Sequence, residues 1–146
     1  MARRSAHRAA GSGPGAAGIR RERAIAGVPD PTGPFAWSVA RGGLVFVSGV
    51  RGIDPATGAP APDDARRIRL IFAHLARILA ANGCAPGDVL STRVYVTDLA
   101  RHRPLVNEAF ARFFGAALPT RTIVEVRALN QGDTVEVEVV ASRNEA

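Results

Sequence analysis

Residues 90–126 read LSTRVYVTDLARHRPLVNEAFARFFGAALPTRTIVEV. At its start, Leu90, Thr92, Val94 and Val96 alternate with Ser91, Arg93 and Tyr95, which is the spacing of a strand whose two faces have different surroundings. Pro104 suits the first turn of a helix that ends before Gly115, and residues 122–127 form the next β-rich run. The stretch therefore predicts strand, helix and strand in that order.

The sequence before this stretch predicts a hairpin and a first helix. Residues 37–40 and 44–48 are β-rich and are separated by the turn pair Gly42-Gly43. After a turn at 54–58, Asp63 or Asp64 can cap a helix that Asn82-Gly83 ends. Its apolar residues recur at helical spacing: Ile68, Ile71, Phe72, Leu75, Ile78 and Leu79.

A last strand, residues 134–141, follows a loop through residues 130–133. The predicted order β-β-α-β-α-β-β gives an α+β fold with two helices on one face of a sheet of four or five strands. In the last strand, valines at 135, 137 and 139 alternate with Glu136, Glu138 and Val140. This mixed face suits a subunit interface with a polar pocket, although an ordinary solvated face has the same pattern.

The formal charge of +6 lies mostly at the N-terminus. Residues 1–28 hold six arginines and Glu22, or +5, so +1 is left for residues 29–146. Because residues 1–28 are rich in Ala, Gly and Arg and lack periodicity, we expect a disordered extension, with the folded domain beginning near Pro34 within 29–146. An RNA-binding arm is the alternative for this extension, but a nearly neutral domain argues against nucleic acid as a partner.

Residue types that the sequence lacks exclude several chemistries. All 19 basic residues are arginine, so lysine Schiff bases, pyridoxal-phosphate lysines and P-loop lysines are impossible. Cys84 is the only cysteine and the three histidines are widely spaced, so we expect neither a disulfide nor a metal site. Without a long apolar stretch, a membrane span or signal sequence is not expected, and we expect a cytoplasmic protein.

Five ordered blocks of the sequence resemble the reactive intermediate deaminase (RidA/YjgF) family across residues 34–143. The family's pattern Pro-x-Arg-Ser/Thr-x-Val-Glu-Val resembles residues 119–126, PTRTIVEV. The other blocks are GPF at 33–35, VSG…DPATG at 47–58, VYVTDL at 94–99 with VNE…FF at 106–114, and VEVE at 135–138. The resemblance implies a chorismate-mutase-like fold, a homotrimer with an inner barrel and clefts between subunits, and no cofactor.

The resemblance also implies an activity: hydrolysis of 2-aminoacrylate/2-iminopropanoate and 2-iminobutanoate to 2-ketoacids and ammonia. Arg121 matches the arginine that binds the substrate carboxylate, a task for which a planar guanidinium is suited. From composition alone, a structural ion pair is the alternative. Glu136 matches the carboxylate that handles the attacking water, with Glu138 as its neighbour or substitute, and burial would raise the pKa of Glu136.

Further pocket residues follow from the same motifs. Ser48, Gly49 and Asn107 match positions that line the substrate pocket, and Phe35 stands there in place of the usual tyrosine. Val50 and Ile123 replace a glutamine and a frequent cysteine, so the pocket is expected to be more apolar. Arg51 is an added cation that could select a dicarboxylate, although a solvated turn arginine is the plainer interpretation.

Two other functions stay open at this point. One is a non-catalytic, chaperone-like trimer that binds small carboxylates. The other is an RNA-acting translation inhibitor, an activity also described for the family.

Overall fold

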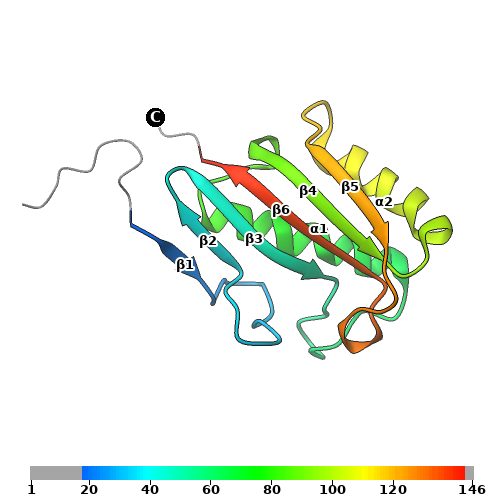
Figure 1. Cartoon of the computed structure of the whole chain (residues 1–146). Coiled ribbons are helices and arrows are strands. Elements are labelled where there is room, and N and C mark those ends of the chain that lie inside the picture. The colour runs from blue at the N-terminus through cyan, green and yellow to red at the C-terminus, as the bar shows by residue number, and fades with distance from the viewer. Residues whose placement is uncertain (1–17, 144–146) are drawn as a thin grey trace, which may run out of the picture.

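The computed structural model describes residues 18–143, which form one sheet and two long helices (Figure 1). The six strands are arranged in the order β1-β2-β3-β6-β4-β5, and only the β4–β5 pair is parallel. The strands are β1 Arg20–Glu22, β2 Ser38–Arg41, β3 Leu44–Arg51, β4 Val89–Val96, β5 Thr120–Glu125 and β6 Val135–Ser142. The helices are α1 Asp64–Ala81 and α2 Leu99–Phe114, with short 3₁₀ turns at Pro86–Asp88 and Asn130–Gly132. The predicted α+β fold is confirmed.

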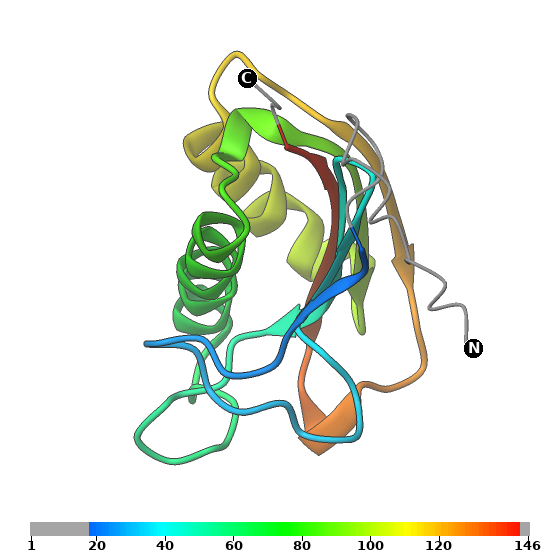
Figure 2. The ribbon, with the colours of Figure 1, turned by 90° about the vertical axis from the view of Figure 1, so that its left-hand side faces the viewer.

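Both helices lie on one face of the sheet, and the other face is left open (Figure 2). The alternating residues of β2, β3, β4 and β6 send one set of side chains toward the helices, where they are buried. Val45, Val94 and Val137 meet Leu75 and Ile78 of α1 in this core. Full burial of each such aliphatic side chain contributes about 1.5–3 kcal/mol, which fixes the helices to this face.

The hairpin and the first helix form where the sequence predicted them. Gly42 and Gly43 both have positive φ, 59° and 81°, as a tight two-residue turn requires, and Arg41 pairs with Leu44 across it. The Asp63 carboxylate accepts a hydrogen bond from the Arg66 amide at 2.8 Å and caps α1.

The predicted start of the second helix at Pro104 is wrong. Helix α2 begins at Leu99, because the Asp98 side chain caps it by accepting from the Arg101 amide at 3.1 Å. Pro104 therefore lies inside the helix, where it lacks only the N–H that would have bonded to the carbonyl of Ala100. The start of the helix is thus set by the Asp98 cap and not by the preference of proline for the first turn.

The expected disorder of residues 1–28 is wrong for residues 18–28. Strand β1 pairs antiparallel with β2, and the Trp37 amide donates to the Glu22 carbonyl at 2.8 Å. Ile25 and Val28 pack against the core, so the folded part begins well before Pro34. The rest of the predicted extension, residues 1–17, lies outside the described residues and stays a prediction.

Leu90 does not share the face of Thr92, Val94 and Val96, to which the alternation assigned it. A bulge between Val89 and Ser91 sets two residues of β4 against one step of β6, and Leu90 is 50% exposed. Val89 is buried in its place. The open face of the sheet exposes Phe46 of β3 and Val124 of β5 and also carries Glu136 and Glu138 of β6.

Candidate functional site

Arg121 lies on β5 and points toward α2. Its Nη2 donates to the Asn107 side-chain oxygen at 2.8 Å, and its guanidinium carbon lies 4.9 Å from the centre of the Phe110 ring. Within residues 18–143 no carboxylate pairs with Arg121, so the structural ion pair is not found there. Burial lowers the pKa of Arg121, as does the nearby Arg103 charge. The result is a cation that is held in place by an amide and an aromatic ring but is not neutralised by them.

Glu136 lies on β6 at the wall of a pocket of about 170 Å³. Burial raises the pKa of its carboxyl group, Arg51 opposes that rise, and Glu138 and Asp133 add to it. A carboxyl group with a raised pKa is a stronger base than an ordinary carboxylate and can both accept and return a proton. The lining includes Phe35, Gly49, Glu136, Arg51, His74 and Asn130.

Gly49 brings the backbone of β3 against Glu136. A Cβ atom at this position would lie 2.7 Å from the carboxyl carbon of Glu136, closer than such atoms approach one another. Any side chain here would displace the carboxylate. Glycine at 49 therefore sets how Glu136 sits in the pocket.

Ser48 has a different environment from the one expected. Its hydroxyl donates to the Ala36 carbonyl at 2.6 Å, and Ser48 is not among the residues that line the pocket. Its hydroxyl thus ties β3 to the segment that leads from Phe35 into β2. Ser48 supports the pocket wall from outside the cavity.

Glu138 is engaged elsewhere. The Tyr95 hydroxyl donates to Glu138 Oε1, which raises the pKa of Tyr95, and Arg93 Nη1 lies 3.9 Å from the same oxygen. Glu138 does not line the pocket, whereas Glu136 does. Of the two carboxylates, Glu136 is the one placed to meet a ligand.

The structure does not bring all the predicted site residues together within one chain. Phe35, Gly49 and Glu136 share one pocket, while Arg121 and Asn107 form a separate pair. Arg121 is level with Thr92 on β4, and Glu136 is level with Tyr95. Arg121 and Glu136 are therefore offset by three residues along the strands and by two strand spacings across the sheet, which is about 10 Å in each direction.

Arg121 and Glu136 also lie on opposite faces of the sheet. Paired residues point to the same side, so Arg121 shares the helix-covered side with the buried Thr92. Glu136 alternates with the buried Val135 and Val137 and therefore lies on the open side. One chain thus presents two candidate half-sites: the Arg121–Asn107 pair and the Glu136 pocket.

Sequence reasoning missed several residues of the pocket lining, His74 and Asn130 among them, and misjudged Arg51. His74 of α1 and Asn130 line the pocket, although neither stands in a recognisable motif. Arg51, expected to be a solvated turn arginine, is only 5% exposed and forms an ion pair with Asp133 at 3.0 Å. The burial of Arg51 could not be predicted locally, because its ion-pair partner Asp133 lies 82 residues away in the sequence. Its position at the end of a strand was the only local indication.

Among residues 18–143, no group of three His, Cys, Asp or Glu side chains is arranged to hold a metal ion. None of the helices in the same part of the chain is both long enough and apolar enough to cross a membrane.

Comparison with known proteins identifies the family. The endoribonuclease L-PSP family model matches residues 26–143. The 2-iminobutanoate/2-iminopropanoate deaminase of Salmonella typhimurium is 35% identical over 118 residues, which are 79% of this chain and 91% of that protein. The crystal structure of Escherichia coli TdcF with bound serine has a TM-score of 0.78 and 30% identity, covering 86% of this chain and 100% of that one. RidA from an Antarctic Psychrobacter has a TM-score of 0.79 and 28% identity, over 84% of this chain and 99% of that one. The chain therefore belongs to the reactive intermediate deaminase (RidA/YjgF) family, which the endoribonuclease L-PSP model describes.

Proposed function

We propose that this protein is a hydrolytic deaminase of small 2-imino acids, with 2-iminopropanoate, its enamine 2-aminoacrylate, and 2-iminobutanoate as substrates. The observation that carries the proposal is Glu136, a half-buried carboxyl group with a raised pKa at the wall of a small pocket. A cavity of about 170 Å³ suits an acid of a few carbon atoms rather than a large ligand. The relative from Salmonella typhimurium is named for this activity.

The proposed reaction adds water across the C=N bond. Arg121 holds the substrate carboxylate through two parallel hydrogen bonds, and Glu136 takes a proton from the attacking water. The hydroxide adds to the imine carbon while Glu136 delivers the proton it took from water to the imine nitrogen, which gives a neutral tetrahedral carbinolamine. Glu136 then takes the proton of the new hydroxyl group and passes it to the amino nitrogen as the C–N bond breaks, so the C=O bond of the 2-ketoacid forms and ammonia leaves.

Carboxylate binding by Arg121 and proton transfer by Glu136 can act on one substrate only if more than one copy of the chain is present. Arg121 and Glu136 lie on opposite faces of the sheet, so a single copy cannot bring them to one substrate. We therefore propose a homotrimer in which Arg121 and Asn107 of one copy complete the Glu136 pocket of the next. The open sheet face has the apolar surface for such an assembly: Leu44, Phe46, Leu90 and Val124.

Ketoacid release from freshly generated 2-iminopropanoate and 2-iminobutanoate tests the function directly. We expect turnover by the purified protein that exceeds spontaneous hydrolysis and needs no added cofactor. A folded protein that binds 2-oxobutanoate in calorimetry without accelerating release would instead be a small-carboxylate-binding trimer. A parallel incubation with single-stranded RNA tests the RNA-acting alternative, and cleavage there without ketoacid release would contradict our proposal.

A further inference from the structure

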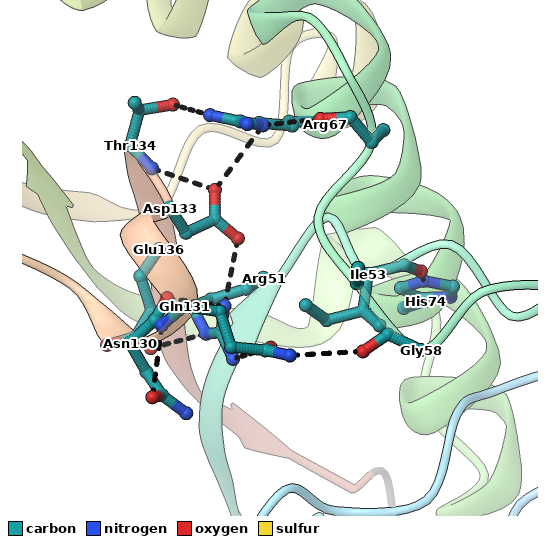
Figure 3. A network of polar contacts seen from close by, with 12 residues as sticks. Arg51, Ile53, Gly58, Arg67, His74, Asn130, Gln131, Asp133, Thr134 and Glu136 are labelled. Carbon is teal, nitrogen blue, oxygen red and sulfur yellow. Dashed lines mark hydrogen bonds and ion pairs between the residues drawn. The ribbon is translucent and has the colours of Figure 1, made fainter.

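Arg51, buried at the end of β3, is the centre of a polar network (Figure 3). Its Nη1 donates to the Asn130 carbonyl and to Asp133 Oδ2, both at 3.0 Å. Its Nη2 donates to Gln131 Oε1 at 2.9 Å. The Asp133 side chain is fully buried, so the two charges compensate each other away from water.

The network orders the loop that leads into β6. Asp133 Oδ1 accepts from the Thr134 amide at 2.8 Å and lies 3.8 Å from Arg67 Nε of α1. Gln131 has a φ of 58°, an uncommon conformation for a residue other than glycine, and its side chain bridges Arg51 and the Gly58 carbonyl. Loop residues 130–133 are thus fixed from both sides, directly before β6 begins.

Arg51 also faces the candidate catalytic carboxylate. It is paired with Glu136 across β3 and β6, and its Nε lies 3.7 Å from Glu136 Oε1. Both residues line the same pocket. Because its other nitrogens already serve Asp133 and the loop, Arg51 has little left to offer a second substrate carboxylate, so selection of a dicarboxylate is not supported.

We propose that Arg51 is a positioning residue, which holds the Glu136 carboxylate as an anion at the pocket wall and fixes the loop from which β6 starts. This inference rests on the proposed deaminase function. Arg51 acts through Glu136 and needs no contact with the substrate.

The charges around Glu136 explain why this arginine matters. Burial, Glu138 and Asp133 all favour the neutral form of Glu136, and Arg51 opposes them. The other titratable groups that face this region are Tyr95, paired with Glu136 on β4, and Asp30 and His74 in the pocket lining. Burial lowers the pKa of His74, so Arg51 is the one fixed cation among these described groups.

The test replaces Arg51 and follows the Glu136 carboxyl group itself. The variants are R51M and, because R51M leaves Asp133 buried with only Arg67 nearby, the double variant R51M/D133N. R67M is the matched control, since Arg67 touches the same Asp133 and the Thr134 hydroxyl but does not contact Glu136. Glu136 is titrated by NMR in protein carrying ¹³C-labelled glutamate, with E136Q identifying its signal, and kcat is measured across the same pH range.

In R51M and R51M/D133N we expect the Glu136 signal to titrate at higher pH than in the wild type. Arg51 affects the pKa of Glu136 more than Asp133 does, so the direction holds in the double variant. At pH values at which Glu136 is protonated in the variants but not in the wild type, kcat should be lower by on the order of 100-fold, which is the usual contribution of a general base to the rate. This loss of kcat should disappear as the pH rises. R67M should change neither the titration of Glu136 nor the pH dependence of kcat, even if it lowers the melting temperature.

An unchanged Glu136 titration in the folded double variant, or a loss of kcat that is equal at every pH, would overturn the inference. A wild-type protein without turnover would overturn the proposed function instead. The titration would still decide in that case whether Arg51 holds Glu136 as an anion.

Discussion

Arg121 is suited to carboxylate binding because its charge is positioned without being neutralised. Asn107 and the Phe110 ring hold the guanidinium, and Arg103 is a like charge nearby. We expect R121K and R121A each to lower kcat/KM by about 2–4 kcal/mol of transition-state binding, since lysine lacks the planar fork. Steady-state kinetics with 2-iminobutanoate measures the loss.

Folding should survive both Arg121 substitutions, because the side chain makes a single hydrogen bond to an exposed asparagine. N107A serves as a control that removes this bond and keeps the cation. It should reduce kcat/KM less than R121A does. Turnover at the wild-type level in R121A would remove Arg121 from the mechanism.

Glu136 is expected to activate the attacking water, a task that stabilises the transition state and not the bound ketoacid. E136Q should therefore lower kcat strongly and weaken the binding of 2-oxobutanoate only slightly. Kinetics and calorimetry on the same preparation separate the two effects. E138Q is the matched control: because Glu138 bonds to Tyr95 outside the pocket, it should retain most of the turnover.

The raised pKa of Glu136 also has a consequence for stability. A carboxyl group whose pKa is higher in the folded state than in the unfolded state favours folding below its unfolded pKa, and this contribution is lost as the pH rises through the folded pKa. E136Q cannot ionise. We therefore expect E136Q to melt at a higher temperature than the wild type at neutral pH, and the difference to vanish in acid; an equal difference at both pH values would contradict the burial argument.

At the scale of elements, local signals predicted the hairpin and the first helix because their causes are local. The Gly42-Gly43 turn and the Asp63 cap both act within a few residues of themselves. The errors at Leu90 and Arg51 have non-local causes: a bulge opposite β6 exposes Leu90, and Asp133 buries Arg51. The family motifs predict Glu136 and Arg121 as site residues, but no local pattern shows which face of the sheet each one takes.

Strand β1 was missed because it is itself arginine-rich and its sequence shows no apolar alternation. The two apolar residues that pack on the core, Ile25 and Val28, follow the strand and do not belong to it. Deletion of residues 1–28 should therefore destabilise the protein by about 2–4 kcal/mol, the value of two partly buried aliphatic side chains and an edge strand. Thermal or urea unfolding measures the difference. Deletion of residues 1–17 is the control and should leave the free energy of unfolding nearly unchanged; equal stability of the two deletions would show that β1 contributes nothing.

At the level of the assembly, the proposed active site is divided between copies of the chain. Phe46 and Val124 leave apolar surface on the open side of the sheet, and the two half-sites lie on different sides of it. Light scattering should show a trimer at micromolar concentration. A monomer that turns over 2-iminobutanoate would contradict both the assembly and the divided site.

The most direct test of the divided site is complementation between two inactive variants. R121A keeps Glu136, and E136Q keeps Arg121, so a mixed trimer contains some sites in which an intact Arg121 meets an intact Glu136. Random assembly from equal amounts of the two chains makes about a quarter of the sites complete. We predict that R121A and E136Q, each nearly inactive alone, regain roughly a quarter of wild-type ketoacid release when they are unfolded and refolded together. No recovery in mixed trimers, shown to contain both chains by mass spectrometry, would contradict a site built from Arg121 of one copy and Glu136 of another.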